Sequence, residues 1–352
     1  MNTTPERIAI GMSGGLDSSV AAAMLVEQGY EVIGLTAHMW KEGSRCCSIE
    51  DVERARKVCW HLDIKHYVLN GSEPFEQNVV TPFVKAYTQG KTPSPCIVCN
   101  EKIKFGYLLN RAIQFDCQGL ATGHYARIIQ EDGLYQLHRA KDLTKDQSYF
   151  LHRLSQQKLA HIFFPLGHLI KQKDVAPYAE THKLPITSRG ESQDLCFVPP
   201  NEYGNFVESH CDNIIKVGPI VDNTGQQLGT HRGIHRYTVG QRRGLNISSP
   251  IPMYVIRIDA PDNTVVVGPR EQAMSQTCVL QDVHWISGQP PQEDGEYDLR
   301  IRYRHNPAPA RIHLAEDGSV HAQYLSPQFA ITPGQSGVIY HGDRVMGGGW
   351  IA

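Results

Sequence analysis

The chain has 352 residues, of which 41% are hydrophobic and 20% are charged, with a formal net charge of −2. At roughly 100–200 residues per domain, this length predicts two or three domains with buried cores, and the composition excludes a wholly disordered chain. The near-zero charge excludes a uniformly basic surface, so positive charge that meets a nucleic acid must be concentrated locally.

Two further features of the sequence indicate the cellular compartment of the protein. No run approaches the roughly 18 consecutive apolar residues of a membrane-spanning helix, and the polar N-terminus leads directly into a strand-like run. Nine cysteines, an odd number in a long chain without a secretory signal, are typical of reduced thiols. We therefore expect a cytoplasmic protein whose cysteines are reactive, metal-binding or buried.

Strand-like and helix-like segments alternate before about residue 190. Short apolar runs predict strands, and longer segments between them predict helices. The expected strands are Arg7–Met12, Glu31–Leu35, Lys65–Leu69 and Gly119–Thr122, and the expected helices are Leu16–Gln28 and Glu50–Leu62. This alternation predicts an α/β domain with a parallel sheet that is covered on both faces.

Beyond about residue 212 the pattern changes to short β-rich runs separated by turn signals. The expected strands are Met253–Ile258, Thr264–Gly268, Asp298–Tyr303 and Gly337–Tyr340. Such spacing is typical of small β-barrels or sandwiches. We expect a catalytic domain over residues 1–212, a central β-rich domain over 213–272 and a C-terminal β-barrel domain over 273–352.

Positive charge gathers in two windows of the β-rich part. His231–Arg243 and Leu299–Ala315 each hold four arginines, two histidines and no acid. In the second window Arg300, Arg302 and Arg304 alternate, so a strand would place all three on one face. A solvated strand face explains such a row about as well as phosphate binding does, although the rigid fork of arginine suits phosphate oxygens.

A glycine-rich hexapeptide, Ser13-Gly14-Gly15-Leu16-Asp17-Ser18, joins the first expected strand to the first expected helix. Glycines let the backbone approach a ligand closely, and the first helical N–H groups point at it, so the segment suits an anion. It is neither a Walker A loop, which needs Gly-Lys-Ser/Thr, nor a dinucleotide G-x-G-x-x-G. The alternative is a plain turn in which Ser13 or Asp17 caps the helix.

The hexapeptide resembles the S-G-G-x-D-S loop of the N-type ATP pyrophosphatases, which cleave ATP to AMP and pyrophosphate while adenylating a substrate oxygen. The resemblance implies that Asp17 holds Mg²⁺ and that Thr36 and Ala37 flank the adenine through backbone atoms. It implies a pyrophosphate cradle made of Gly11, Met12, Ser13, Gly14, Gly15, Leu16, Asp17 and Ser18.

The cysteines alone leave several interpretations open. The segment Pro95–Asn100 contains a C-x-x-C pair, which could be half of a zinc site, a redox-active pair or a chance spacing of two cysteines. A structural zinc site needs four ligands, and the adjacent Cys46 and Cys47 make a poor chelate. The prolines before Cys96 predict a loop, whereas a thioredoxin-like pair opens a helix close after a strand. Cys196 by itself suits a buried structural cysteine.

Taken together, the motifs resemble those of the bacterial and organellar tRNA-specific 2-thiouridylases, in order across nearly the whole chain. The matching stretches are G-M-S-G-G-L-D-S-S (11–19), P-C-I-V-C-N (95–100), A-T-G-H-Y-A-R (121–127), K-D-Q-S-Y-F-L (145–151), E-S-Q-D-L-C-F (191–197), G-I-H-R-Y-T-V-G-Q-R-R-G-L (233–245) and P-G-Q (333–335). The resemblance implies an N-type ATP pyrophosphatase domain followed by two β-rich tRNA-binding domains.

The resemblance also implies ATP-dependent 2-thiolation of the wobble uridine in tRNAs that read Lys, Glu and Gln codons. ATP adenylates the C2 oxygen and releases pyrophosphate, and a cysteine persulfide then attacks C2 and displaces AMP. By resemblance Cys196 carries the persulfide, supplied by a cysteine desulfurase or a relay protein, and Cys96 frees the sulfur by attack or by completing a disulfide. Each thiolate needs a lowered pKa, for which a helix N-terminus, Arg189, Lys102 and Lys104 are candidates.

Cys99 admits two interpretations. It is a bystander or, together with Cys96 and Cys196, a ligand of an iron–sulfur cluster with one open iron, which is the less favoured scheme. The other six cysteines are expected to be packing or surface residues: Cys46, Cys47, Cys59, Cys117, Cys211 and Cys278.

A set of tRNA contacts follows from the same resemblance. Thr92, Pro93 and Ser94 stand where many members have Asn-Pro-Asp, so this loop is expected to face the target base although the carboxylate is missing. Gly123 is placed at ATP and His124 near the target uridine, which must be extruded from the anticodon stack. Contacts with the tRNA are further implied for Lys145, Asp146, Gln147, Arg302, Tyr303 and Gln335.

Two other functions are open on the sequence. Another adenylating enzyme of the same fold, such as a 4-thiouridine synthase or an amide-forming synthetase, would bring an N-terminal RNA-binding domain or a glutamine amidotransferase domain, and neither is visible. An RNA-binding regulator on an inactive ATPase scaffold is the non-enzymatic alternative. The intact glycine-rich loop, with both Cys96 and Cys196 present, argues against it.

Overall fold

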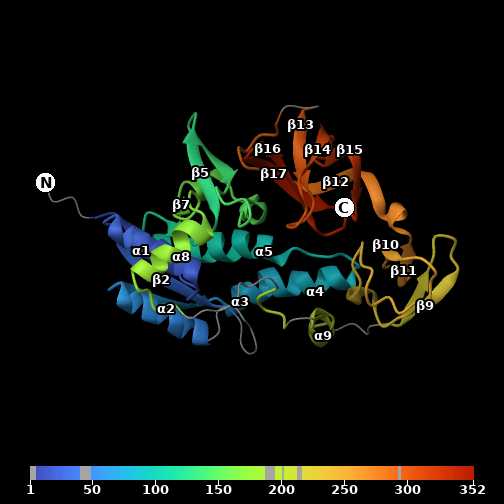
Figure 1. Cartoon of the computed structure of the whole chain (residues 1–352), viewed down its shortest axis with the longest axis horizontal. Helices are drawn as coiled ribbons and strands as arrows, with labels where there is room; N and C mark the ends of the chain where they lie inside the picture. The colour runs from blue at the N-terminus through green and yellow to red at the C-terminus, as the bar shows by residue number, and fades with distance from the viewer. Residues whose placement is uncertain (1–4, 40–48, 187–194, 200–201, 212–215, 292–294) are drawn as a thin grey trace.

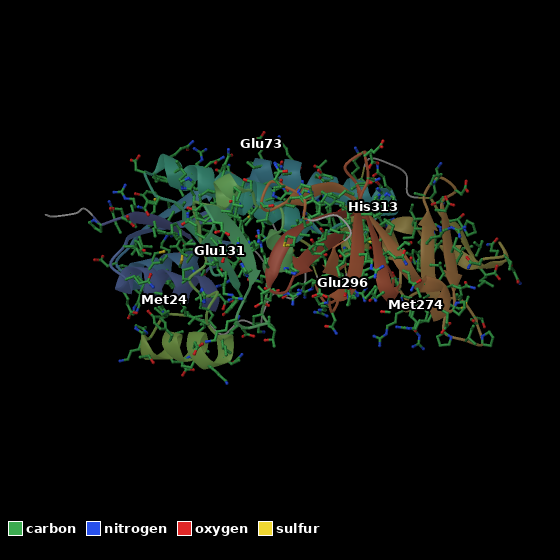
Figure 2. The ribbon with its side chains drawn as sticks, turned by 90° about the horizontal axis from the view of Figure 1, so that it is seen from above. Met24, Glu73, Glu131, Met274, Glu296 and His313 are labelled. Carbon is green, nitrogen blue, oxygen red and sulfur yellow. The ribbon has the colours of Figure 1, made fainter. Side chains whose placement is uncertain are left out.

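The computed structural model describes residues 5–39, 49–186, 195–199, 202–211, 216–291 and 295–352. Its parts are a sheet with covering helices, a β-barrel and a smaller β-sheet (Figure 1). Seen from above, they follow one another from Met24 in the first helix, past Glu131, to Glu296 in the barrel and Met274 near the small sheet (Figure 2). Within the described residues, no helix is both long enough and apolar enough to cross a membrane.

The N-terminal part is built on a five-stranded parallel sheet with the order β3-β2-β1-β4-β7. On β1, Ala9 packs into one core cluster while Ile8 and Ile10 pack into another, so both faces of the sheet are covered. The predicted α/β fold is therefore confirmed. The elements are β1 (Arg7–Gly11), α1 (Leu16–Glu27), β2 (Glu31–His38), α2 (Ile49–His61), β3 (Lys65–Asn70), β4 (Leu120–Ala121) and β7 (Ile162–Phe163).

The second strand is longer than the sequence predicts. β2 continues three residues past Leu35 because Thr36 and Ala37 pair with Val68 and Leu69 of β3. Both side chains are buried, so the extra residues belong to the core. The extension carries the end of β2 to the level of the glycine-rich loop.

The C-x-x-C pair opens a long helical stretch that lies centrally in Figure 1. This stretch is α5 (Pro95–Val98), the π-helix η2 (Cys99–Leu108), which is kinked at Phe105, and α6 (Leu109–Gln114). It follows a first run of α3 (Ser72–Phe75), η1 (Glu76–Val80) and α4 (Thr81–Thr88). The predicted loop before the cysteines is present, but the pair sits in a helix that follows another helix and not a strand.

A six-stranded antiparallel barrel forms the C-terminal part, with the order β12-β15-β14-β13-β16-β17 closed by pairing of β12 with β17. The hairpin β5 (Ala126–Glu131) and β6 (Leu134–Arg139) extends its sheet, because Val345 of β17 pairs with Leu137 of β6. The barrel strands are β12 (Met274–Trp285), β13 (Glu296–Arg300), β14 (Ala308–Leu314), β15 (Val320–Phe329), β16 (Ser336–His341) and β17 (Arg344–Ile351).

The central β-rich part is a four-stranded sheet with the order β10-β11-β8-β9. Its strands are β8 (Gly218–Val221), β9 (Gln227–His231), β10 (Tyr254–Asp259) and β11 (Thr264–Gly268). Short helices join these parts: η3 (Ser148–Leu151), α7 (Gln156–Leu159), η4 (Lys171–Val175), α8 (Ala176–Thr181), α9 (Tyr203–Ser209), η5 (Ile234–Arg236) and η6 (Arg270–Ala273).

The predicted strand with three arginines on one face is wrong. β13 ends at Arg300, and the chain then turns, with the His305 N–H donating to the Arg302 carbonyl at 3.0 Å. Ile301, the first residue past β13, is buried in the barrel core. Arg300 and Arg302 are half-buried and Arg304 is exposed, so the three side chains have different environments.

Candidate active site

The glycine-rich loop connects β1 to α1 and leaves the first helical N–H groups without a side-chain cap. Its bonds are local: Ser18 and Ser19 donate their hydroxyls to the Gly15 carbonyl at 3.2 and 2.8 Å. Gly14 has φ +71°, and a Cβ there would come within 2.7 Å of the Arg54 Cβ. Only glycine fits this position, and the helix start presents free backbone donors to an anion, so the capping alternative is not what forms here.

Asp17 lies at the start of α1 beside two partners that the sequence analysis missed. The Tyr125 hydroxyl donates to Oδ1 at 2.7 Å, and the Lys171 ammonium donates to Oδ2 at 2.8 Å. The Lys171 side chain is only 10% exposed, against 31% for Asp17. The Asp17 carboxylate and the Lys171 ammonium therefore form an ion pair where the glycine-rich loop enters α1. A signal for Tyr125 was present, because it lies in the A-T-G-H-Y-A-R motif, whereas Lys171 had none.

Gly123 follows β4 and packs directly on the glycine-rich loop. A Cβ at this position would lie 2.6 Å from the Asp17 carbonyl carbon and 2.7 Å from the Ser18 nitrogen. No side chain fits between the two backbones. The end of β2 reaches the same loop, because the Thr36 hydroxyl donates to the Met12 carbonyl at 2.9 Å. These contacts bring Gly11–Ser18, Thr36 and Gly123 together, and Ala37 is the next residue of β2 after Thr36.

His124 is buried and lies between a cation and a hydroxyl. The Lys104 ammonium donates to Nε2 at 3.2 Å, so the ring proton sits on Nδ1 and points at Thr122 Oγ1, 2.7 Å away. Burial first, and the Lys104 charge second, hold the His124 pKa well below its ordinary value. His124 is therefore a neutral ring at physiological pH. Of the cations expected to serve the thiolates, Lys104 is engaged with His124, Lys102 pairs with Glu101, and Arg189 lies outside the described residues.

The cysteines fall into two groups by environment. Burial raises the pKa of Cys59 and Cys278 to about 12 and that of Cys117 to about 11, so these thiols stay protonated and serve packing. Cys96 is exposed and is the second residue of the long helical stretch. Cys99 and Cys196 are half-buried, and both pack against the same core cluster.

Among the described cysteines the structure forms no disulfide. Likewise, in the part of the chain that is described, no group of three or more His, Cys, Asp or Glu side chains is placed to hold a metal ion. Cys211 is half-buried, and Cys46 and Cys47 lie outside the described residues.

The loop expected to face the target base is held by distant parts of the chain. The Gln335 amide donates to the Thr92 and Pro93 carbonyls at 3.0 and 3.2 Å. The Thr92 N–H donates to the Pro333 carbonyl at 2.9 Å, and its hydroxyl donates to Thr238 Oγ1 at 3.1 Å. The barrel and Thr238, which lies between η5 and β10 of the central β-rich part, thus both contact the segment that leads into Cys96.

Comparison with known proteins places the chain in a family. Residues 6–200 match the model of a tRNA methyl transferase HUP domain, residues 204–269 a tRNA methyl transferase PRC-barrel domain, and residues 275–351 an aminomethyltransferase β-barrel domain. The tRNA-specific 2-thiouridylase MnmA of Magnetococcus marinus is 46% identical, covering 99% of both chains. Those of Geobacter metallireducens and Chloroflexus aggregans are 44% identical, covering 98% of this chain and 96% and 98% of theirs. The chain belongs to the tRNA-specific 2-thiouridylase family.

Several tRNA contacts that the 2-thiouridylase resemblance implies are engaged inside the protein. Asp146 is buried and accepts from the Ala140 N–H at 3.0 Å and the Ser148 hydroxyl at 2.9 Å. Gln147 accepts from the Tyr125 N–H at 3.0 Å. Lys145 is half-buried. These contacts order the loop before η3 and tie it to Tyr125, the partner of Asp17.

The barrel turn after β13 reaches the same loop. The Tyr303 ring lies 4.5 Å from the Phe150 ring, and Arg302 donates to the Phe329 carbonyl at 3.0 Å. Burial lowers the pKa of Arg302 relative to a solvated guanidinium. In this member of the 2-thiouridylase family, Tyr303 therefore connects the barrel to the segment that packs beside the cysteine helix.

Proposed function

We propose that this chain is an ATP-dependent tRNA-uridine 2-sulfurtransferase that acts on the wobble uridine of tRNAs for Lys, Glu and Gln. The observation that supports it is the pair Gly123–His124. Gly123 packs against the glycine-rich loop, and His124 contacts Lys104 on the helix that begins around Cys96. Two consecutive residues thus join an anion-binding loop to a thiol-bearing helix, as adenylation followed by sulfur transfer requires.

In the first step, the uridine O2 attacks the α-phosphorus of ATP and pyrophosphate leaves. Gly11–Ser18 hold the phosphates through backbone N–H groups, and Ala37 lies near the adenine. A single carboxylate suits Mg²⁺, which usually takes one or two carboxylates plus substrate phosphates, so Asp17 would hold it and the ion would offset the charge of the pyrophosphate. Lys171 adds a second positive charge beside Asp17.

In the second step, the terminal sulfur of a Cys196 persulfide attacks C2. The C2–O bond breaks, and AMP leaves with the oxygen that was O2. The thiolate of the partner cysteine then attacks Cys196 Sγ, which breaks the S–S bond, leaves the terminal sulfur on C2 and forms a protein disulfide. A thiol reductant reduces that disulfide, and a cysteine-desulfurase-derived donor or relay protein renews the persulfide.

The partner cysteine in this scheme is Cys96. It is exposed, and it sits in the first turn of a long helical stretch, where backbone N–H groups stabilise a thiolate. Cys99 is the second candidate, because it and Cys196 pack against the same core cluster. An iron–sulfur cluster would need all three thiols as ligands, and the described residues place no group of three such side chains to hold a metal ion, so no step is derived through a cluster.

Two surfaces are proposed to hold the tRNA. The target base enters beside the loop Thr92–Ser94 and His124, and Gln335 holds that loop from the barrel. The turn with Arg302, Tyr303 and the exposed Arg304 meets the phosphate backbone, together with Lys145. Asp146 and Gln147 shape the loop that presents Lys145.

The three parts are proposed to be domains that span residues 1–212, 213–272 and 273–352. The protein is proposed to act in the cytoplasm. The hairpin β5–β6 is the element that crosses this division, because it belongs to the first range in sequence and pairs with the barrel in space. Its position keeps the barrel fixed relative to Gly123 and His124, which immediately precede it.

The test is reconstitution with ATP, Mg²⁺, a persulfide donor and unmodified tRNA for Lys, Glu or Gln. We expect 2-thiouridine at position 34, with one AMP and one pyrophosphate per thiolated base and no AMP without tRNA. Thiolation at C4, or AMP release that ignores tRNA, would contradict the proposal. The same assay with a tRNA that has adenosine at position 34 is the matched control.

A further inference from the structure

Asn100 carries a buried oxygen that has no hydrogen-bond partner. Asn100 is only 3% exposed, and its Nδ2 donates to the Phe150 carbonyl at 3.3 Å. That carbonyl can only accept, so the amide orientation is fixed and Oδ1 faces the other way. Oδ1 is one of the few buried side-chain atoms in the described residues that lack a partner. Such an atom costs stability unless a ligand or water satisfies it.

The place of Asn100 on its helix points to the ligand. Asn100 comes four residues after Cys96 and four before Lys104. A π-helix has about 4.4 residues per turn and an α-helix 3.6, so residues four apart share one face in either geometry. Lys104 in turn contacts His124, next to Gly123 at the glycine-rich loop. Asn100 therefore lies on the helix face between a thiol and a cation that are both assigned to the proposed active site.

We propose that Asn100 Oδ1 accepts the N3–H of the target uracil and so selects uridine over cytidine. This inference rests on the proposed function. Uracil carries a donor at N3 between two carbonyls, whereas cytosine carries a lone pair there, which would oppose the Oδ1 lone pair. Both bases have a C2 carbonyl, so discrimination between them has to come from N3 and position 4.

The same contact strengthens as the reaction proceeds. When O2 becomes bonded to phosphorus and N3 keeps its proton, the ring carries a positive charge, so N3–H becomes a stronger donor. The persulfide anion that attacks C2 neutralises this charge, and N3 still carries its proton in the 2-thiouridine product. An acceptor fixed opposite N3–H therefore binds the adenylated base more tightly than the resting base, which raises the rate as well as the selectivity. Phe150 fixes the amide, and its ring contacts Tyr303 of the barrel at 4.5 Å.

The experiment compares Asn100→Ala with Asn100→Asp on one tRNA that carries either uridine or cytidine at position 34. The readouts are 2-thiouridine, 2-thiocytidine and AMP. Wild type is expected to prefer uridine strongly. Asn100→Ala removes the hydrogen bond to uracil N3–H and also the repulsion between Oδ1 and the N3 lone pair of cytosine. Its uridine-to-cytidine ratio of kcat/KM should therefore fall by about tenfold to a hundredfold. In Asn100→Asp, a protonated carboxyl can donate its O–H to the Phe150 carbonyl and keep its other oxygen toward N3, so its ratio should stay within about threefold of wild type at a pH at which this buried carboxyl is protonated.

The control is Asn78→Ala, which removes a similar bond, from Asn78 Nδ2 to the Pro74 carbonyl at 2.7 Å, away from the site. The uridine-to-cytidine ratio of Asn78→Ala should equal that of wild type, even if the variant has a lower melting temperature. An unchanged ratio in a folded Asn100→Ala protein would overturn the assignment. If Asn100→Ala does not fold, the isosteric Asn100→Asp tests the assignment instead. A loss of the uridine-to-cytidine preference in a folded Asn100→Asp protein would then overturn it. A wild-type enzyme that makes no 2-thiouridine contradicts the proposed function itself, which is a separate outcome.

Discussion

The glycine-rich loop and the loop at residues 92–95 lie near the same site but are held in different ways. The first has short-range bonds, such as Ser19 Oγ to the Gly15 carbonyl, and its other partners, Tyr125 and Lys171 on Asp17, belong to the same N-terminal part of the chain. The second is held by Thr238, Pro333 and Gln335, more than 140 residues away in sequence. The proposed phosphate-binding loop is thus held within the first domain, whereas the loop proposed to face the base is also held by both β-rich parts.

This difference separates two kinds of variant. A change in the glycine-rich loop should stop adenylation and leave tRNA binding in place. A change at the contacts between barrel and loop should leave ATP binding in place and lower the yield of thiolated base. The cysteines are proposed to act after adenylation, so their variants should uncouple AMP formation from thiolation.

The largest effect is expected for the cysteines. Cys196→Ser should lower thiolation by about a thousandfold or more, because serine forms no persulfide, while ATP and tRNA binding persist. Cys96→Ser should still form the Cys196 persulfide but fail to release the sulfur. Mass spectrometry after donor treatment, beside nucleoside analysis of the tRNA, measures both.

Cys99→Ser is the matched variant for that experiment. Normal thiolation by Cys99→Ser is expected if Cys96 is the partner of Cys196. An inactive Cys99→Ser with an active Cys96→Ser would give the partner role to Cys99. If both are inactive and both lose iron after anaerobic purification, the cluster scheme replaces the persulfide scheme.

A large effect is also expected for Asp17. Asp17→Ala should lower pyrophosphate release by about a hundredfold or more, because the loop loses its only carboxylate, while the tRNA Kd stays near wild type. Asp17→Asn controls for folding, since its amide oxygen still accepts from Tyr125 or Lys171. Pyrophosphate release at the wild-type rate in either variant would contradict the role of Asp17.

A moderate effect is expected for Gln335. Gln335→Ala removes two donated bonds to the Thr92 and Pro93 carbonyls, so the loop before Cys96 loses its barrel support. Thiolation should fall about tenfold, which corresponds to roughly one hydrogen bond, with an unchanged ATP Kd. Single-turnover thiolation and ATP titration check it. A normal rate would show that the barrel does not act through this loop.

The smallest effect concerns the turn after β13. Arg304→Gln should reduce the log–log salt slope of tRNA binding by about one, because one exposed guanidinium is lost. Arg302→Gln should change that slope less, because Arg302 already donates to the Phe329 carbonyl, and it should lower the melting temperature more. Equal slopes in wild type and Arg304→Gln would mean that the turn is merely solvated.

The sequence predicted the parts of the molecule that local signals determine. Strand–helix alternation and Gly14-Gly15 were enough for the parallel sheet and the glycine-rich loop. The arginine row at 300–304 was misjudged because alternation suggests a strand, whereas β13 ends at Arg300 and the His305 N–H bonds to the Arg302 carbonyl in a turn. Lys171 and Asn100 were missed because their roles depend on contacts, with Asp17 and Phe150, that no spacing in the sequence encodes.

The most direct test of the central claim follows one oxygen atom. A tRNA whose wobble uridine carries ¹⁸O at C2 is thiolated by the enzyme, and the AMP is analysed by mass spectrometry. Adenylation of O2 followed by sulfur attack at C2 predicts one ¹⁸O in each AMP for each 2-thiouridine formed. AMP without ¹⁸O, formed in step with 2-thiouridine, would contradict the account.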